Sequence, residues 1–361
     1  QALGRLQTTA SVLHTGAHPD DEDSAFIARA ARGDHARVAY MALNRGEGGQ
    51  NIIGLELFDA LGVIRTEELL QARRLDGAEQ LFGHTFDYGF SKSRTEATAK
   101  WGERETLADI VRAIRLFRPL VVYARFSGSP ADGHGHHQMS GYLTPIAFKA
   151  AADPTQFPEQ LQEGLRPWQA RKLYRGSRND PGPVLQVQTG VFDPLIGRTY
   201  AELSFEGRSQ HKTQAQGGIE PRGPQASPLL WLAGGPQPTR ADASMFDGLD
   251  TSVPALAALV DLPDAAERRA ILDLQLRRRR PEHRITLDVV VDRTAGFSGA
   301  ELEQLVIEAM HQAFSEGREF GEPDLISAAA QLVPLSRTAR EQLEALQQWA
   351  SSGRARPEIG R

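Results

Sequence analysis

The first part of the chain alternates short apolar runs with amphipathic segments. Apolar runs at 12–15, 37–43 and 120–124 predict buried strands. The segments between and after them carry apolar residues on one face, which predicts helices at 23–32, 66–82, 105–117 and 138–152. This alternation predicts an α/β fold, a Rossmann-like layered domain with a mostly parallel sheet.

The pattern changes after this region. Residues 153–224 are rich in Pro, Gly and Gln, although 184–190 alternate and predict a strand. Residues 200–214 predict a helix whose polar end holds His211, more simply a solvated histidine than one that contacts a substrate. The Pro- and Gly-rich stretch at about 217–250 predicts a long loop over the first domain.

Near Asp261 the composition changes again. Amphipathic helices are predicted at 265–272, 299–314, 322–332 and 337–349. Nothing after Val291 resembles a buried strand, so this part is expected to be all-α. Ser298 and Glu301 have the spacing of a capping box at one helix start. We therefore expect two domains, at 1–255 and 256–361.

Composition narrows the classes of function. The chain has 361 residues, of which 40% are hydrophobic and 24% charged, as in globular proteins. A net charge of -5 gives no basic footprint for nucleic acid, and the four arginines at 277–280 suit a solvated helix end. No run of eighteen apolar residues predicts a membrane span. The absence of cysteine excludes disulfides and thiolate ligands. Because the chain starts at Gln1 without a leader, an exported protein with its signal peptide removed is favoured over a cytoplasmic one, with a fragment as the alternative.

The first candidate for chemistry is the turn at 17–22, directly after the first predicted strand. His18 and Asp21 are three residues apart in a Pro-containing turn, so both side chains can face one divalent cation. Asp20 lies between them and would face the metal's water, where a general base is needed. The alternative is a solvated acidic loop that caps the next helix.

The second candidate is the histidine cluster His134, His136 and His137, which follows the predicted strand at 120–124. Loops at the carboxyl ends of parallel strands are where open α/β folds place their sites. The two clusters together supply two histidines and one carboxylate, the ligands of a zinc site with one open position. A histidine-rich surface loop is the alternative.

These motifs resemble those of the PIG-L/LmbE-like zinc-dependent deacetylases. Residues 17–22 read Ala-His-Pro-Asp-Asp-Glu as in that family, and 134–137 match its His-x-x-His motif. The resemblance covers about 10–255 and continues through 44–51, 65–69, 87–92 and 207–212.

The resemblance implies a role for each motif residue. It places the zinc ligands on His18, Asp21 and His137 and the general base on Asp20. It assigns His134 to the oxyanion or the leaving amine. Many members of the family have aspartate where this chain has His136.

The implied activity is removal of an acetyl group from an N-acetylated amino sugar or related glycoconjugate, through a water activated by one zinc or another divalent metal. The small-molecule substrate is expected to contact the Gly-rich turn, where Arg45, Glu47 and Asn51 are candidates; a flexible, ion-paired loop is the alternative. The opposed hypothesis is a non-catalytic binding or assembly protein whose helical C-terminal domain docks a partner.

The C-terminal part resembles a different family. Residues 261–264, 294–303 and 333–338 are similar to the C-terminal helical lid of AAA ATPases. The ATPase core is missing, since the chain has no Gly-x-x-x-x-Gly-Lys-Ser/Thr and no apolar strand ending in paired acids. We therefore expect no ATP hydrolysis.

Overall fold

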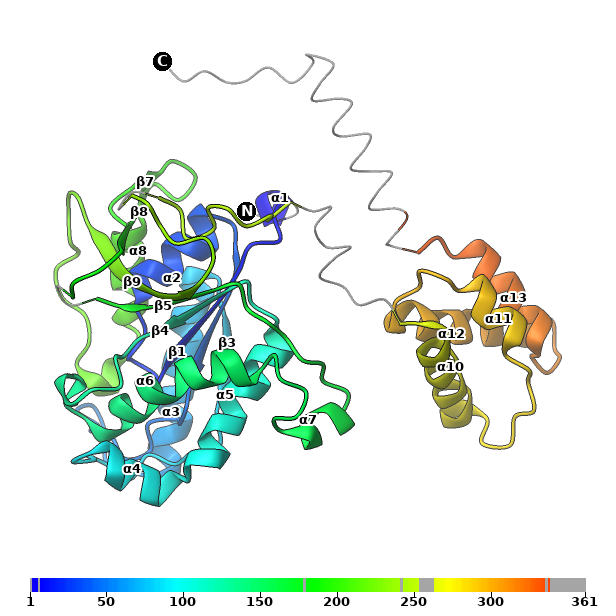
Figure 1. The fold of residues 1–361 in the computed structure, drawn as a ribbon, viewed down its shortest axis with the longest axis horizontal. Coiled ribbons are helices and arrows are strands. Elements are labelled where there is room, and N and C mark those ends of the chain that lie inside the picture. Colours follow the sequence, from blue (N-terminus) through cyan, green and yellow to red (C-terminus); the bar gives the residue numbers. More distant parts are fainter. Residues whose placement is uncertain are drawn as a thin grey trace, which may run out of the picture. The chain divides into compact units, whose positions relative to one another are not determined.

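The computed structural model describes residues 2–5, 7–177, 180–240, 243–252, 263–334 and 337 (Figure 1). The chain divides into two compact units, Gln1–Ser252 and Val253–Arg361. Among the described residues, no helix is both long and apolar enough to cross a membrane.

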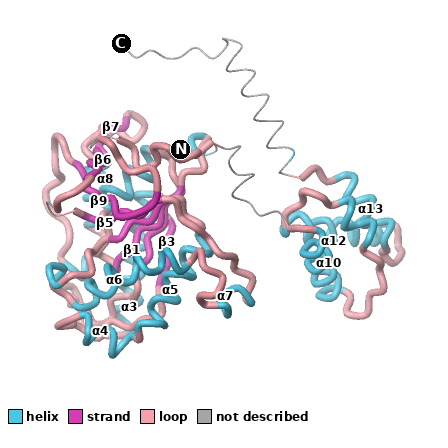
Figure 2. Tube along the Cα trace, viewed as in Figure 1, coloured by secondary structure: helices cyan, strands magenta, loops and turns pink. Residues whose placement is uncertain are grey.

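A seven-stranded sheet lies at the centre of the first unit, with helices around it (Figure 2). Its strands in spatial order are β3 (Glu79–Phe82), β2 (Arg37–Ala42), β1 (Ser11–Gly16), β4 (Val121–Ala124), β5 (Lys172–Gly176), β9 (Ala226–Gly234) and β6 (Val184–Gln188). The first five pair in parallel, and β9 pairs antiparallel with both β5 and β6. The predicted mostly parallel α/β sheet is confirmed.

The helices of the first unit pack in two groups. One group consists of α2 (Ser24–Ala28), α3 (Asp59–Asp76) and α8 (Tyr200–Arg208), and the other of α4 (Arg94–Trp101), α5 (Glu103–Phe117) and α6 (Gly135–Ala150). The remaining short elements are α1 (Ala2–Arg5), a π-helical turn at Arg29–Gly33, α7 (Pro158–Gln162), the ribbon β7 (Phe192–Asp193) and β8 (Arg198–Thr199), and 3-10 turns at Pro130–Asp132 and Lys212–Gln214. In α5 the predicted apolar face is buried, through Ile110, Val111 and Ile114.

The strand order places two loops side by side. From β1 the chain runs outward to β2 and β3, then returns to β4 on the opposite side of β1. The loops that follow β1 and β4 therefore leave the same edge of the sheet next to each other, at the position where ligands bind in open α/β folds.

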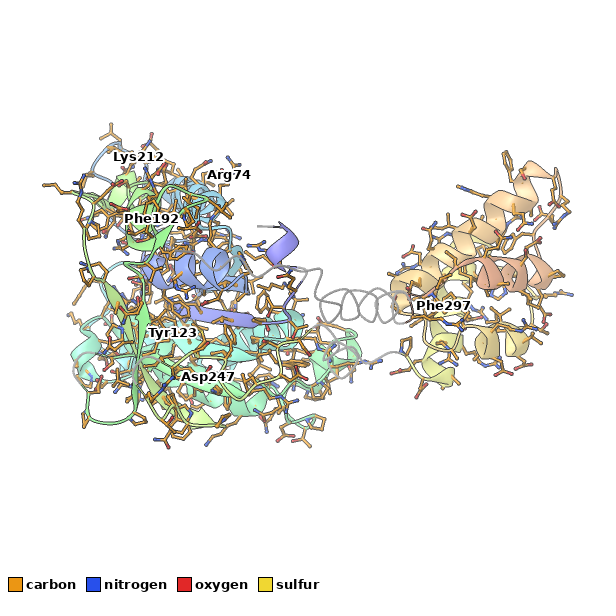
Figure 3. The ribbon with its side chains drawn as sticks, turned by 90° about the horizontal axis from the view of Figure 1, so that it is seen from above. Arg74, Tyr123, Phe192, Lys212, Asp247 and Phe297 are labelled. Atoms are coloured by element: carbon orange, nitrogen blue, oxygen red, sulfur yellow. The ribbon has the colours of Figure 1, made fainter. Side chains whose placement is uncertain are left out.

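The buried histidine His14 of β1 holds the start of the loop that follows β1. Its Nδ1 donates to the Tyr123 carbonyl (2.9 Å), and its Nε2 accepts from the Asp23 amide (3.0 Å). The His14 ring stacks on the Tyr123 ring with centroids 4.2 Å apart, and Figure 3 labels this tyrosine. Burial lowers the pKa of His14 to about 4, so the ring stays neutral and acts as both donor and acceptor.

Three segments differ from the sequence pattern. The helix predicted at 66–82 ends at Asp76, because Gly77 takes a left-handed conformation (φ 80°), and residues 79–82 pair with β2. The helix predicted at 200–214 ends at Arg208. The loop predicted at about 217–250 contains β9, whose pairing partners lie far away in the sequence.

The second unit is helical, as predicted. It contains α10 (Ala265–Arg279), α11 (Asp288–Arg293), α12 (Gly299–Ser315) and α13 (Glu322–Gln331). Phe297, labelled in Figure 3, belongs to a core with the apolar faces of these helices, such as Leu302 and Leu325. The predicted capping box between Ser298 and Glu301 is confirmed. The helix predicted at 337–349 falls outside the described residues, apart from residue 337.

Candidate metal centre

The loop after β1 is held rigidly by its own carboxylate and by the neighbouring strands. Asp21 Oδ2 accepts from the backbone amides of Ala17 (3.0 Å) and His18 (2.6 Å). The Tyr40 hydroxyl donates to the His18 carbonyl (2.7 Å), and Arg125 Nε donates to the Asp21 carbonyl (2.7 Å). These contacts come from β2 and from the residue after β4, so the sheet itself sets the direction of both side chains.

The second half of the centre is the start of α6. His134 is the N-cap residue of this helix, and its Nδ1 accepts from the His136 amide (3.2 Å). The cap places His136 and His137 in the first helical turn. His137 Nδ1 donates to the Asp132 carbonyl (3.2 Å), which leaves the lone pair of its Nε2 facing the loop after β1.

The two halves meet in a compact triad of donor atoms. His18 Nδ1 lies 3.1 Å from His137 Nε2 and 3.2 Å from Asp21 Oδ2. His137 Nε2 lies 3.2 Å from Asp21 Oδ1. Ligand atoms on one tetrahedral zinc are separated by roughly 3.3–3.6 Å, given bond lengths of roughly 2.0–2.2 Å. The three residues therefore fit a zinc ion in both chemistry and spacing.

The charge on the carboxylate also suits a cation. Burial alone would raise the pKa of Asp21, but His137 and His18 hold it well below its ordinary value. Asp21 is therefore ionised at neutral pH, as a metal ligand must be.

His136 occupies the position behind His18 and is fully buried. Its Nδ1 lies 3.1 Å from His18 Nε2, and its ring stacks on Trp101 with centroids 4.0 Å apart. Burial and then the neighbouring histidines lower the pKa of His136 to about 2, so the ring is neutral and its Nδ1 can accept a hydrogen bond from His18 Nε2–H. The carboxylate of Asp87 lies beside the pair, 3.9 Å from His18 Nε2 and 3.7 Å from His136 Nδ1.

Asp20 directly precedes Asp21 in the chain, and residues outside the triad hold its carboxylate. Arg65 Nη2 donates to its Oδ1 (2.5 Å), and Gln216 Nε2 donates to its Oδ2 (3.2 Å). Arg65 is buried, and its Nη1 donates to the Gly46 carbonyl (3.0 Å). The carboxylate therefore has a defined orientation and a cationic partner.

His134 faces the triad with its ring centroid 5.0 Å from those of both His18 and His137. Burial, followed by the charges of those two histidines, lowers the pKa of His134 to about 4. Since Nδ1 accepts from a backbone amide, the proton of the neutral ring lies on Nε2. His134 is thus a neutral hydrogen-bond donor beside the triad.

Comparison with known families agrees with this geometry. Residues 13–148, which contain both halves of the centre, match the family model described as GlcNAc-PI de-N-acetylase, or PIG-L. Residues 13–148 form a PIG-L domain. The model of the AAA+ lid domain matches residues 284–327, which span α11 and α12 and reach into α13. Both resemblances seen in the sequence motifs are confirmed.

Three known proteins show how similar this chain is to others in sequence and in fold. The uncharacterized AAA domain-containing protein ycf46 of Pyropia yezoensis is 46% identical over 99 residues, 27% of this chain and 20% of the relative. The mycothiol S-conjugate amidase of Streptomyces coelicolor is 29% identical over 158 residues, 40% of this chain and 53% of the amidase. N,N'-diacetylchitobiose deacetylase from Pyrococcus horikoshii has a TM-score of 0.45 at 20% identity, covering 56% of this chain and 70% of that one. The chain spans a fifth of the length of the ycf46 relative.

The three residues predicted to contact the substrate form hydrogen bonds to other residues of the PIG-L domain. Arg45 donates to Thr66 (3.1 Å), and Glu47 Oε2 accepts from the amides of Arg45 and Asp87 (both 3.2 Å). Asn51 Oδ1 accepts from two amides in its own turn. These contacts shape the loop after β2, and direct contact with a substrate stays a prediction.

One histidine that supports the centre comes from outside the matched residues of the PIG-L domain. His211 is fully buried, and its Nε2 lies 3.1 Å from Glu22 Oε1, so the simpler interpretation of a solvated histidine is wrong. Its neighbour Lys212 is exposed at the edge of the unit (Figure 3). Arg73 of α3 also donates to Glu22 Oε1 (3.4 Å). Glu22, the last residue of the 17–22 motif, is the acidic member of this buried ion pair. Its partners His211 and Arg73 lie far away in the sequence, so the local sequence does not predict them.

This ion pair leads to a prediction about stability. Burial alone would raise the pKa of Glu22, but His211 and Arg73 lower it from 4.5 to about 2. The stabilisation is therefore fully present above about pH 4.5 and is lost as the pH falls towards 2. Glu22→Gln is expected to lower the free energy of unfolding at pH 7 by up to about 3 kcal/mol, and by less at lower pH. Urea unfolding of both proteins at pH 7, 5 and 3.5 measures this.

A matched control is Glu79→Gln. Glu79 pairs with Arg37 on the surface, where both side chains are about half exposed, so its loss is expected to change stability by less than about 1 kcal/mol. A difference between Glu22→Gln and wild type that stays constant with pH would contradict the assigned role of the Glu22 charge.

Proposed function

We propose that the first unit is a zinc-dependent hydrolase that removes an acetyl group from an N-acetylated amino sugar or a related glycoconjugate. The observation that carries this proposal is the triad of His18, Asp21 and His137, with Asp20 and His134 beside it. The match to the PIG-L family supports a metal-dependent deacetylase. The likeness to an amidase, a name that denotes cleavage of an amide bond, points to the same reaction class.

The triad would hold the zinc ion. Zinc, when bound, supplies the Lewis acidity that polarises the acetyl carbonyl and acidifies water. Ionised Asp21 supplies one negative charge. The Nδ1 proton of His137 is held by the Asp132 carbonyl and the Nε2 proton of His18 by His136, so each imidazole presents a lone pair to the centre.

Two further side chains would act on the reacting groups, one by accepting a proton and the other by donating a hydrogen bond. Asp20 accepts the proton of the water that attacks the acetyl carbon, because it directly precedes the proposed ligand Asp21 and the resemblance to the PIG-L family assigns it the role of general base. Neutral His134 donates its Nε2 proton in a hydrogen bond to the carbonyl oxygen as that oxygen becomes negative.

Two measurements on the full chain test the proposal. Metal analysis after chelation and reloading is expected to find one zinc per chain. Incubation of the loaded protein with N-acetylglucosamine and N,N'-diacetylchitobiose is expected to release acetate from at least one of them. A chain that binds no stoichiometric metal would instead support the non-catalytic assembly hypothesis.

His134→Ala is expected to keep one zinc per chain and to lose activity by roughly 100-fold or more, since a hydrogen-bond donor to the oxyanion is removed while the ligands remain. Zinc content and the rate of acetate release measure the two effects separately. The control is His84→Ala, because the His84 side chain is half exposed and pairs with Asp109 away from the centre. Loss of zinc from His134→Ala would show that this residue is a ligand.

A chain ending near Ala255 is expected to fold, to bind zinc and to keep its activity. All seven strands of the central sheet and all triad residues precede residue 253, and the second unit has a core of its own. Circular dichroism, zinc content and acetate release from the truncated chain are compared with those of the full chain. If truncation removes zinc or activity, the helical unit is part of the enzyme.

A further inference from the structure

We infer that the segment at 208–216, which lies outside the residues matched to the PIG-L family, positions Asp20 through the side chain of Gln216. The inference rests on the proposed function, because it assigns a role to a residue that acts through the proposed general base. Gln216 is a positioning residue in this scheme and does not contact the substrate.

The amide of Gln216 links two groups with defined polarity. Its Nε2 donates to Asp20 Oδ2 (3.2 Å), and its Oε1 accepts from Arg208 Nη2 (2.8 Å). The cationic donor on one side requires the oxygen there, so the nitrogen must face the carboxylate. Gln216 therefore has one orientation in which both contacts are satisfied, and in it the amide donates to Asp20.

Gln216 and Arg65 hold opposite oxygens of the same carboxylate. Arg65 donates to Oδ1 (2.5 Å), whereas Gln216 donates to Oδ2. Each carboxylate oxygen accepts about two hydrogen bonds, so one donor on each leaves capacity for the attacking water. Two donors at different oxygens prevent rotation of the carboxylate, which one donor alone does not.

Gln216 holds the carboxylate without bringing a second cation to it. Its neutral amide donates to Oδ2, whereas the cationic donor Arg65 contacts Oδ1. Arg208, the cation that orients Gln216, donates to two backbone carbonyls of the loop after β1 (residues 17–22, the metal loop), those of Asp20 (3.5 Å) and Glu22 (3.3 Å). Among the described contacts, the guanidinium of Arg208 reaches the Gln216 amide oxygen and not the Asp20 carboxylate.

The 208–216 segment has its own anchors, so Gln216 does not depend on Asp20 for its place. Thr213 donates to buried Glu68 of α3 through its amide (2.8 Å) and its hydroxyl (2.7 Å). His211 lies against Glu22. Ala215 takes a left-handed conformation (φ 54°), uncommon for a residue with a Cβ, and turns the chain so that the next side chain faces the metal loop.

The test is a comparison of wild type, Gln216→Ala, Asp20→Asn and the double variant, all as full chains loaded with zinc. With N-acetylglucosamine or N,N'-diacetylchitobiose as probe, Gln216→Ala is expected to lower kcat by about 10- to 100-fold, with KM and zinc content unchanged. In the Asp20→Asn background the same change is expected to cause no further loss, because its effect passes through Asp20. The control is Gln188→Ala, an exposed glutamine of β6 bonded to the Gln186 carbonyl.

Two kinetic outcomes would overturn the inference. One is full activity of Gln216→Ala, and the other is an additive loss in the double variant, which would mean that Gln216 acts on something other than Asp20. A crystal structure of Gln216→Ala gives a readout that does not need turnover. The Asp20 carboxylate is expected to leave the position it has in wild type, and an unmoved carboxylate would refute the positioning role. A wild-type chain that releases no acetate contradicts the proposed function, and the crystal structure then still decides whether Gln216 holds Asp20.

Discussion

His137→Ala is expected to give a folded chain that holds no stoichiometric zinc and releases no acetate. The imidazole supplies one of three donor atoms, and its Nε2 lies within 3.2 Å of both other ligand residues. Two ligands bind zinc far more weakly than three, so metal is lost on dialysis. Zinc per chain by mass spectrometry and the rate of acetate release are the measurements, with His84→Ala as the matched histidine control.

Asp21 needs a more careful substitution, because it holds the loop as well as the metal. Its Oδ2 accepts from two amides of the same loop, so Asp21→Ala removes a loop contact and a ligand together. Asp21→Asn retains an oxygen for those amides and removes the charge, and it is expected to bind zinc weakly while losing less thermal stability than Asp21→Ala. If His137→Ala kept its zinc through dialysis, the ligand assignment would be wrong.

Asp20→Asn is expected to keep one zinc per chain and to lose activity by a factor of roughly 100 to 10,000, the range that a general base contributes. Asparagine has nearly the same shape and still offers one oxygen to Arg65, but it cannot accept the proton of the attacking water. Metal analysis with kcat and KM on the same preparation separates loss of the base from loss of the metal.

Asp20→Asn also leaves a buried arginine without its charged partner, so some loss of stability is expected. Thermal unfolding below the assay temperature would therefore have to be excluded before the rates are compared. The assignment of Asp20 and Asp21 would be reversed if Asp20→Asn lost the metal while Asp21→Ala retained it.

The sequence predicted those parts of the centre that lie close together along the chain. His18, Asp20 and Asp21 fall within one turn, and His134 and His137 within another, so the motifs and the family resemblance that they carry were sufficient to name them. The strand order then brings the two turns together at one edge of the sheet. The ligand and catalytic roles themselves stay predictions.

The residues that hold these side chains were not predicted, because their contacts join distant parts of the chain. The metal loop is contacted by Tyr40 from β2 and by Arg65 from α3. It is also contacted by His211 and Gln216 from the segment after α8. No local pattern marks such partners, and an isolated Gln or His in a polar stretch has the pattern of a solvated residue. The same reason applies to β9, whose pairing with β5 and β6 depends on strands far away in the sequence.

The 208–216 segment contacts the metal loop, which is made much earlier in synthesis. The parts of the proposed site are therefore completed at different times as the chain is made. A nascent chain that has left the ribosome as far as α6 already carries every proposed zinc ligand. At that stage Glu22 has no His211 to pair with, and Asp20 lacks Gln216. The ligands can gather around a metal ion early, whereas the carboxylates beside them reach their final positions only after α8 and the following turn have been made. Capture of the metal and the onset of catalysis are therefore expected to be separate events in the life of each new chain.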